Sequence, residues 1–316
     1  MRKIEIIIII ILIFAGIFVA YNYVFSPADN ISVPAKNDSG NLTGSQTAEN
    51  SNVPAQEQKL WGAYVAPSSG SVFSFEQMIG KRPDMLAVFI SWDEEFPNDF
   101  ALSSGQTLVI FWEQYEVSLD EIISGKSDSY ISRFAKYAKA YNSPVIIAPF
   151  HEMNGDWSPW SGAYGNNTPE KFILAWKHVY DIFDNVKDDN IKWAWVVNHE
   201  SVPDTVVNAI ESYYPGDGYA DYVGIDGFNF GDPWETYDEI FSLALDKIKK
   251  YNKPIYIFSM ASAEGLRKDD WIKDALTKIK SDPNIKGFIW FNENKEKNWL
   301  INSDPNSLQA FIQGIK

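Results

Sequence analysis

From Leu60 to the C-terminus, short apolar runs alternate with longer amphipathic stretches. The short runs are apolar on both faces, which is typical of strands in a parallel sheet that is covered by helices. Eight such units in about 250 residues match a closed (β/α)8 barrel, the TIM barrel fold. The expected strands are Trp61–Val65, Leu86–Trp92, Leu108–Trp112, Val145–Phe150, Trp193–Asn198, Tyr222–Phe228, Ile255–Ser259 and Gly287–Asn292.

The stretches between these runs have a helical period. Apolar residues recur at spacings of three and four from Tyr237 to Ile248, so one face of a helix is expected to be buried there. Another helix is expected after Thr168, which can cap its first turn, with Pro169 at the first position. An open, doubly wound sheet is the alternative, but no Gly-x-Gly-x-x-Gly phosphate loop follows the first expected strand.

The first 59 residues follow other patterns. Residues 6–25 are almost continuously apolar, and about twenty residues can span a hydrocarbon core of about 30 Å. Arg2 and Lys3 precede this run, which favours a cytoplasmic N-terminus and a folded part outside the cell. We therefore predict that residues 1–25 form a transmembrane helix that anchors the protein in the membrane. A cleavable signal peptide, and hence a secreted protein, is the alternative.

Residues 26–59 are rich in Asn, Ser, Ala, Pro and Thr and contain few large apolar side chains. Such a segment cannot bury enough surface to offset the entropy that ordering would cost. It is expected to be a flexible, low-complexity linker, and residues 60–316 are expected to form the barrel.

Composition narrows the range of partners. The net charge is −15, with acidic residues along the whole chain, and this argues against nucleic acid as a partner. The absence of cysteine excludes disulfides and thiolate chemistry, and the three histidines lack the spacing of a metal site, so no metal or other cofactor is expected. Twelve tryptophans favour a polysaccharide or oligosaccharide ligand, because the C–H faces of a sugar pack on aromatic rings.

Polar and aromatic residues gather where the expected strands end, which is the active-site face of such a barrel. The fourth strand leads into His151 and Glu152, and Trp157 and Trp160 follow. An acid beside flat apolar rings suits a sugar, although such a loop can also be a packing lid and such a glutamate a structural ion-pair partner. The other candidates for this cleft are Trp112, Glu113, Asn198, Asp226, Phe228, Ser259 and Trp290.

Four segments carry a family resemblance. The run Pro-Phe-His-Glu-Met-Asn-Gly-Asp-Trp-Ser-Pro-Trp at 149–160 resembles the acid/base region of glycoside hydrolase family 26, whose members are mainly β-mannanases and related β-glucanases. Residues 111–113 resemble that family's Trp-Glu strand end, and residues 195–198 resemble its Trp-x-x-Asn motif. Residues 213–227 resemble its Tyr-Pro-Gly-Asp and Gly-x-Asp-Gly-Tyr-Asn segment. The similarity extends from about Trp61 to Ile312.

This resemblance implies an endo-acting, retaining hydrolase of β-1,4-linked mannan or a related glucan, in which Glu152 is the acid/base. The family's nucleophile would be a glutamate at the end of the seventh strand, in a pattern such as Lys-Pro-Ile-x-Ile-x-Glu. Here the chain has Lys-Pro-Ile-Tyr-Ile-Phe-Ser, so Ser259 stands in the nucleophile's place. Phe228 replaces a common tyrosine, and Ala148 stands where an arginine is common. Impaired or altered catalysis is therefore expected, because a serine without an adjacent base is a poor nucleophile.

Three functions remain open at this stage. The chain is expected to be a hydrolase with impaired catalysis, and the alternatives are an inactive glycan-binding protein at the cell surface or a structural scaffold. Asp226 or Glu113 could replace the missing carboxylate in an inverting reaction, which needs carboxyl groups about 6.5 to 9.5 Å apart. The separation between Glu152 and its nearest carboxylate therefore distinguishes an inverting arrangement from a retaining one.

Overall fold

A computed structural model describes residues 58–186 and 189–316. The predicted anchor at 1–25 and almost all of the linker at 26–59 lie outside the described residues, so both remain predictions. In the part of the chain that is described, no helix combines the length and the apolar character that a bilayer crossing requires. The described residues belong to one compact unit that ends at Lys316.

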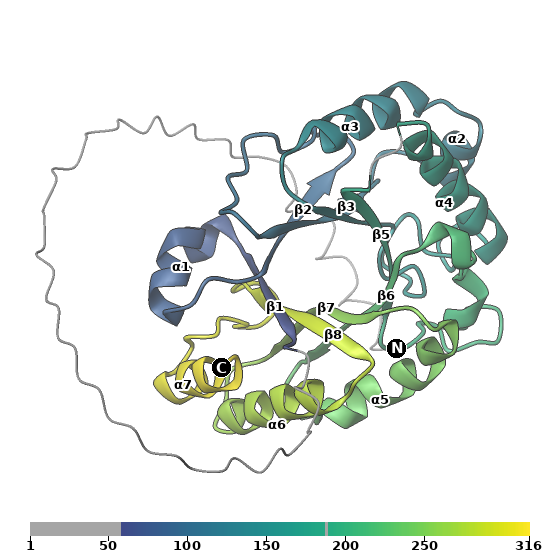
Figure 1. Ribbon diagram of the computed structural model, residues 1–316. Helices are drawn as coiled ribbons and strands as arrows, with labels where there is room; N and C mark the ends of the chain where they lie inside the picture. Colours follow the sequence, from purple (N-terminus) through teal and green to yellow (C-terminus); the bar gives the residue numbers. More distant parts are fainter. Residues whose placement is uncertain (1–57, 187–188) are drawn as a thin grey trace, which may run out of the picture. The chain divides into compact units, whose positions relative to one another are not determined.

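The strands form a closed parallel barrel in chain order, in which β8 pairs with β1 (Figure 1). This confirms the predicted (β/α)8 architecture and removes the open doubly wound sheet from consideration. Each expected strand is present, with bounds that differ from the prediction by a few residues. The strands are β1 (Leu60–Val65), β2 (Met85–Ser91), β3 (Thr107–Glu113), β4 (Val145–Pro149), β5 (Ile191–Asn198), β6 (Tyr222–Asn229), β7 (Ile255–Ser262) and β8 (Ile285–Asn292).

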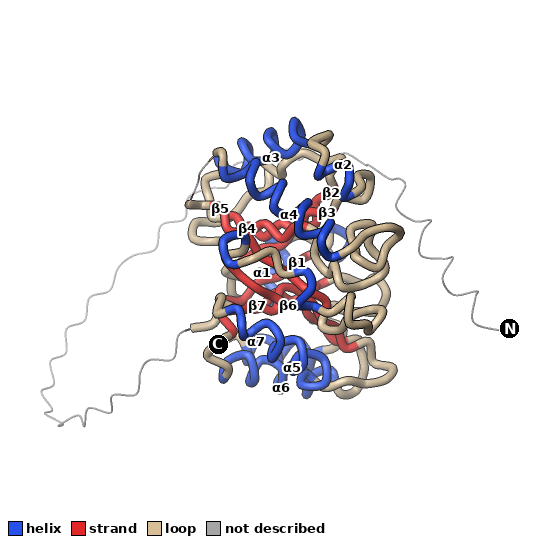
Figure 2. Tube along the Cα trace, turned by 90° about the vertical axis from the view of Figure 1, so that its right-hand side faces the viewer, coloured by secondary structure: helices blue, strands red, loops and turns tan. Residues whose placement is uncertain are grey.

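Helices surround the barrel (Figures 1 and 2). They are α1 (Val72–Ile79), α2 (Leu119–Ile123), α3 (Asp128–Ala140), α4 (Pro169–Asp184), α5 (Tyr237–Ile248), α6 (Lys268–Ser281) and α7 (Pro305–Gly314). The Thr168 hydroxyl accepts a hydrogen bond from the Lys171 N–H and so caps α4 as predicted. Helix α5 has the predicted bounds and buries its apolar stripe.

Alternate strand residues belong to two separate apolar layers. Val109, Phe111 and Ala148 belong to a cluster made of strand residues, which fills the barrel interior. Their neighbours Ile110 and Trp112 belong to the larger cluster that includes the helices. Successive residues of a strand therefore face the interior and the helices in turn. We call this alternation the parity of a position, and it decides which strand-end residues reach the expected cleft.

Candidate active site

A sharp turn after β4 presents the central acid. Phe150 and Glu152 both have positive φ, 54° and 56°, a region that non-glycine residues rarely occupy. The backbone N–H of Glu152 donates to the Val196 carbonyl at 3.0 Å, which ties this turn to β5. Strain of this kind persists only where surrounding contacts hold it, and it is common at functional sites.

Asn154 links the same turn to the end of β5 and to the residues that follow it. Its side-chain amide donates to the carbonyls of Asn198 and Glu200, and its side-chain oxygen accepts from the Asn198 N–H at 2.9 Å. Asn208 donates to the Asn154 carbonyl at 2.8 Å. Asn198, which was expected to bind substrate, contacts the loop that carries Glu152 through its backbone, and its role in binding stays a prediction. Asn154 belongs to the 149–160 motif, but its spacing gave no hint of this anchoring role.

His151 bridges two carboxylates from other strands. Its Nδ1 lies 3.1 Å from Asp226 Oδ2 on β6, and its Nε2 lies 3.3 Å from Glu113 Oε1 on β3. The Tyr115 hydroxyl donates to the same Glu113 oxygen at 2.8 Å. The imidazole can satisfy both carboxylates only when both of its nitrogens carry protons. The site therefore holds a charged imidazolium between two acids.

The electrostatics of this group follow from burial and pairing. Burial opposes the charge on His151, but the hydrogen bonds to Asp226 and Glu113 outweigh it and raise the His151 pKa to about 10. Burial raises the pKa of Asp226, while His151 and the Ser259 backbone N–H act in the opposite direction. Burial also raises the pKa of Tyr115, with a further contribution from Glu113, so this phenol stays a neutral donor.

Glu152 is the acid whose charge changes near neutral pH. Burial, and then the nearby Asp226 carboxylate, raise its pKa to about 7, against smaller opposing effects of His151 and Trp157. The Trp157 indole donates to Glu152 Oε2 at 2.9 Å, and 48% of the Trp157 side chain remains exposed. A carboxyl group of this pKa can act as an acid and as a base at neutral pH. An exposed ring fixed beside it offers a surface on which a sugar can stack.

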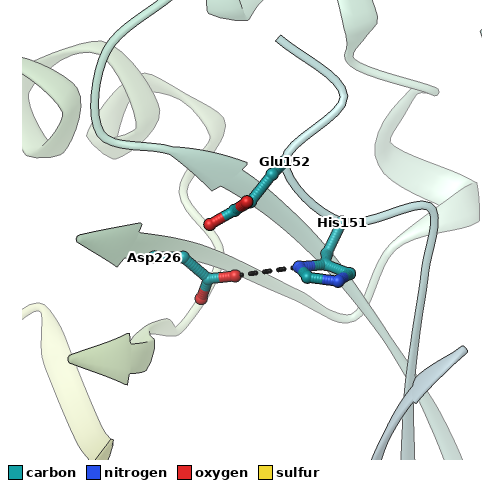
Figure 3. Close-up of side chains that lie close together, drawn as sticks. All are labelled: His151, Glu152 and Asp226. Carbon is teal, nitrogen blue, oxygen red and sulfur yellow. Dashed lines mark hydrogen bonds and ion pairs between the residues drawn. The ribbon is translucent and has the colours of Figure 1, made fainter. Parts of the chain in front are cut away.

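The Glu152 and Asp226 carboxyl groups lie close together (Figure 3). One oxygen of each, together with one ring nitrogen of His151, lie within 4.8 Å of one another. This spacing is near the 5 to 5.5 Å of retaining glycosidases and below the range of inverting ones, which leave room for a water. The inverting pair of Glu152 with Asp226 that the sequence left open is therefore not the arrangement found.

Ser259 lies on β7 directly across from Asp226. The register of β6 and β7 shifts by one residue between Ile225 and Asp226, and the Cα partner of Asp226 is Ser259. Ser259 is buried, with 4% of its surface exposed. Ser259 thus lies next to Asp226 on the neighbouring strand, and its role as the altered nucleophile position stays a prediction.

The other two departures from the family pattern lie near the same group. Phe228, two residues after Asp226, packs against Phe291 at a ring-centroid distance of 5.6 Å and against Trp299 at 5.3 Å, and it has no hydroxyl to donate. Ala148 is fully buried in the barrel interior, beside Phe111 on β3. Both positions, where the resemblance predicts polar groups, are apolar here.

Three of the four predicted tryptophans do not form an exposed sugar platform. Trp112 and Trp290 have no exposed surface because their parity directs them toward the helices. The Trp112 ring stacks on Phe134 of α3 at 4.3 Å, and the Trp290 ring contacts Phe311 of α7 at 5.6 Å. Neither ring offers an exposed face to a substrate in this structure, and their role in binding stays a prediction.

Trp160 is also buried, with 1% of its surface exposed. Its indole donates to the His151 carbonyl, and its ring lies 5.2 Å from that of Tyr115. Trp160 therefore packs against the backbone and ring that form the site. Of the four predicted tryptophans, only Trp157 keeps an exposed ring there. Tyr115, which the strand-end reasoning missed, is 43% exposed and follows Glu113 by two residues, so the same strand-end argument could have found it.

The candidate metal ligands in the described residues are the same His151, Glu152 and Asp226. A histidine ligand must offer a neutral nitrogen lone pair, yet both nitrogens of His151 face carboxylates and its raised pKa keeps it protonated. The donor set therefore does not suit a metal ion. The expectation that the protein needs no metal or cofactor remains a prediction.

Comparison with known proteins agrees with this geometry. A family model described as glycosyl hydrolase family 26 matches residues 86–306. Endoglucanase H of Acetivibrio thermocellus is 38% identical over 271 residues, which cover 80% of this chain and 30% of that protein. A mannan endo-1,4-β-mannosidase of Bacillus subtilis is 30% identical over 142 residues, 41% of this chain and 38% of that protein. The chain thus spans well under half the length of these curated relatives.

Solved structures agree on the fold. A GH26 β-mannanase from Bacteroides ovatus superposes with a TM-score of 0.60 at 16% identity, over 82% of this chain and 88% of that one. At this identity the likeness supports the barrel architecture only.

Proposed function

Because this chain belongs to glycosyl hydrolase family 26, we propose that it acts on a β-1,4-linked glucan or mannan, with Glu152 as the acid/base and with impaired turnover. The observation that carries this proposal is Glu152 itself, a partly buried acid with a pKa near 7 that is fixed beside the exposed ring of Trp157. The relatives named endoglucanase and mannan endo-1,4-β-mannosidase support the substrate class.

Glu152 can supply the proton that bond cleavage, the first step of the reaction, requires. Below about pH 7 the Glu152 carboxyl group is protonated and can donate its proton to the glycosidic oxygen as the C–O bond breaks. The substrate's anomeric carbon then carries developing positive charge, which a carboxylate normally stabilises and traps in a retaining enzyme. A serine hydroxyl at position 259 has no charge to offset it. We therefore expect hydrolysis to be slowed at least about 10³-fold relative to a site with both carboxylates.

The neighbouring acids are poor substitutes for the missing one. Asp226 is 1% exposed and bonded to His151, so it would have to leave that partner to reach an anomeric carbon. Glu113 accepts hydrogen bonds from both His151 and Tyr115. Both carboxylates are thus already hydrogen-bonded to the His151 imidazolium.

A second candidate function is glycan binding without turnover. The presence of Ser259, Phe228 and Ala148 together favours it, because three positions that support the family's chemistry have all lost their polar or charged groups. If the predicted anchor at 1–25 is present, such a protein would hold a polysaccharide at the outer face of the membrane.

An assay of reducing ends tests the loss of the nucleophile. The full-length chain, incubated with mannan and with mixed-linkage β-glucan, is expected to release very few reducing ends, and Ser259→Glu is expected to increase the release. The matched control is Ser129→Glu, which adds the same charge on the exposed surface of α3 and should change nothing. Rapid release by the unmodified chain that disappears in Glu152→Ala would refute impaired catalysis.

Titration of tryptophan fluorescence with manno- and gluco-oligosaccharides tests binding. A change that is absent in Trp157→Phe would assign binding to this cleft. No change at millimolar oligosaccharide would argue against both candidate functions. If Ser259→Glu restores no hydrolysis although binding is intact, Phe228 and Ala148 become the next positions to change.

A further inference from the structure

Basic side chains gather at the edge of the barrel that lies opposite the cleft. Because the strands are all parallel, their first residues lie at one edge and their last residues at the other. Lys59 precedes β1, and Lys81 and Arg82 lie shortly before β2. Lys280 lies in the last turn of α6, before β8, and Lys316 follows α7. These residues therefore share the edge at which the strands begin.

Side-chain contacts join these segments into one surface. The Lys59 ammonium group donates to two backbone carbonyls at the turn into β8, at 2.7 and 2.6 Å. The Lys81 ammonium group donates to the Ile315 carbonyl at 2.6 Å, which joins the turn before β2 to the end of α7. Lys59, Lys280 and Lys316 also line one hollow between these segments. We call this surface, at the strand starts of β1, β2, β7 and β8, the basic face.

The basic face keeps its charge where its lysines bond to carbonyls. A carbonyl accepts a hydrogen bond but carries no opposing unit charge, so the lysines bonded in this way still attract anions. Lys253, which precedes β7, likewise donates to a backbone carbonyl at 2.7 Å. Lys249 and Lys250 instead pair with Asp282 and Glu211, at 3.2 and 3.4 Å, which offsets their charges. Acids at this edge therefore balance some of its bases and leave others available to a partner.

The cleft edge has the opposite sign. The loop at 92–101, after β2, contains four acids and no Lys or Arg. The segments 199–209, after β5, and 230–236, after β6, each contain two acids and no Lys or Arg. The net charge of −15 is thus distributed unevenly along the barrel axis, with acids around the cleft and bases at the opposite end.

We propose that the basic face docks on the anionic headgroups of a phospholipid membrane, and that the cleft then faces away from the lipid. Each Lys or Arg held near an anionic lipid surface strengthens binding by about fivefold. Gln58 and Lys59, the first described residues, both line the hollow of the basic face. The preceding chain, which includes the predicted anchor at 1–25, therefore joins the barrel at this face. The proposal goes beyond the proposed function, which concerns the cleft alone.

The acids around the cleft do not oppose this contact at physiological salt, because screening limits their reach to about 8 Å. An eight-residue strand such as β7 rises about 26 Å, which exceeds that distance about threefold. A membrane that touches the basic face therefore senses mainly the nearby lysines. At 1 M salt the screening length falls to about 3 Å, so docking should be lost.

The absence of cysteine allows a test by site-specific labelling. Ser104→Cys places a fluorescent donor in the turn before β3, at the strand-start edge, and Ser68→Cys places one after β1, at the cleft edge; both serines are exposed. The labelled full-length chain is reconstituted into vesicles that contain an acceptor dye at the headgroups. In a mixture of phosphatidylcholine and phosphatidylglycerol, energy transfer from position 104 should rise and that from position 68 should fall, relative to phosphatidylcholine alone. In 1 M salt both changes should disappear.

Charge reversal identifies the surface that is responsible. Lys280→Glu combined with Lys316→Glu should abolish the lipid-dependent change at position 104. The milder pair Lys280→Ala and Lys316→Ala should lower the ratio of docked to undocked protein by about 25-fold, at about fivefold per lysine. Lys295→Glu combined with Lys297→Glu is the matched control, because it makes the same charge change in the loop after β8, at the cleft edge. This control should leave the change intact.

Three results would overturn the proposal. Energy transfer from both positions that is the same in the two kinds of vesicle would show that anionic lipid does not orient the barrel. A rise at position 68 instead of position 104 would place the cleft against the lipid. Equal losses in the two charge-reversed pairs would show that the basic face is not responsible. These measurements use no glycan, so their outcome is independent of the proposed function.

Discussion

His151 is the residue on which the charge balance of the site depends. It lies between Asp226 and Glu113, and a neutral imidazole could donate to only one of them. Its positive charge permits several acids to share a buried site, and it opposes the effects that raise the pKa of Glu152. The neighbouring histidine, His199, behaves in the opposite way, because burial lowers its pKa.

This balance predicts how stability changes with pH. The pKa of His151 is about 10 in the folded protein and 6.5 when unfolded, so its stabilising effect is complete below pH 6.5 and is lost as pH rises toward 10. Above pH 8, Lys268 acts in the opposite sense, because burial lowers its pKa to about 8. Between pH 6.5 and 8 the free energy of unfolding should fall by about 2 kcal/mol through His151, at about 1.4 kcal/mol for each pKa unit. Glu152, whose pKa burial raises to about 7, adds to the fall below pH 7.

Urea unfolding at several pH values measures this loss. His151→Gln should remove most of the slope between pH 6.5 and 8, and His199→Gln should keep it, because His199 titrates below this window. If His151→Gln does not fold, Glu113→Gln, which removes one of the two partners, should shift the loss to lower pH. A free energy that stays flat in the unmodified chain would mean that His151 is not held as an imidazolium.

At the scale of the elements, strand parity separates packing tryptophans from a binding tryptophan. Trp112 ends β3 with its ring on α3, and its indole donates to the Tyr130 hydroxyl at 3.1 Å. The next residue, Glu113, has the opposite parity and reaches His151. Trp157 lies in the loop after β4, and 48% of it is exposed.

Substituting these two tryptophans should therefore have opposite effects. Trp112→Ala should destabilise the fold by about 3 to 5 kcal/mol, as the loss of a large buried side chain does, and Trp112→Phe should cost less and retain sugar binding. Trp157→Ala should cost at most about 1 kcal/mol and weaken sugar binding strongly. Urea midpoints and oligosaccharide titrations measure the two effects. Loss of binding in a stably folded Trp112→Phe would place that ring in the cleft after all.

At the scale of the whole molecule, the residue before the first strand also contacts the barrel. Lys59 precedes β1, and its ammonium group donates to the carbonyls of Asp282 and Ile285 at 2.7 and 2.6 Å, which join the start of the folded chain to the turn before β8. These bonds make the exact starting residue matter for stability.

Two truncations test this. A chain of residues 55–316 should unfold in one cooperative transition with the melting temperature of the full-length protein in detergent. A chain of residues 60–316 should be less stable by about 1 to 3 kcal/mol, because it loses two hydrogen bonds from a charged group. Calorimetry compares the three. Equal stability of the two fragments would show that Lys59 contributes nothing.

The sequence by itself determined the order and number of the strands, the buried faces of α4 and α5, and the chemical identity of the site. Glu152 follows the end of β4 by three residues, and the resemblance to the family predicts a carboxylate at the position where Ser259 stands. Only the tertiary structure decided which strand-end residues meet. Strands covered on both faces are apolar at every position, so their sequence carries no alternation from which parity can be inferred. For that reason Trp112 and Trp290 could not be told from cleft residues, and the bridge from Glu113 through His151 to Asp226 became visible only when β3, β4 and β6 were brought together.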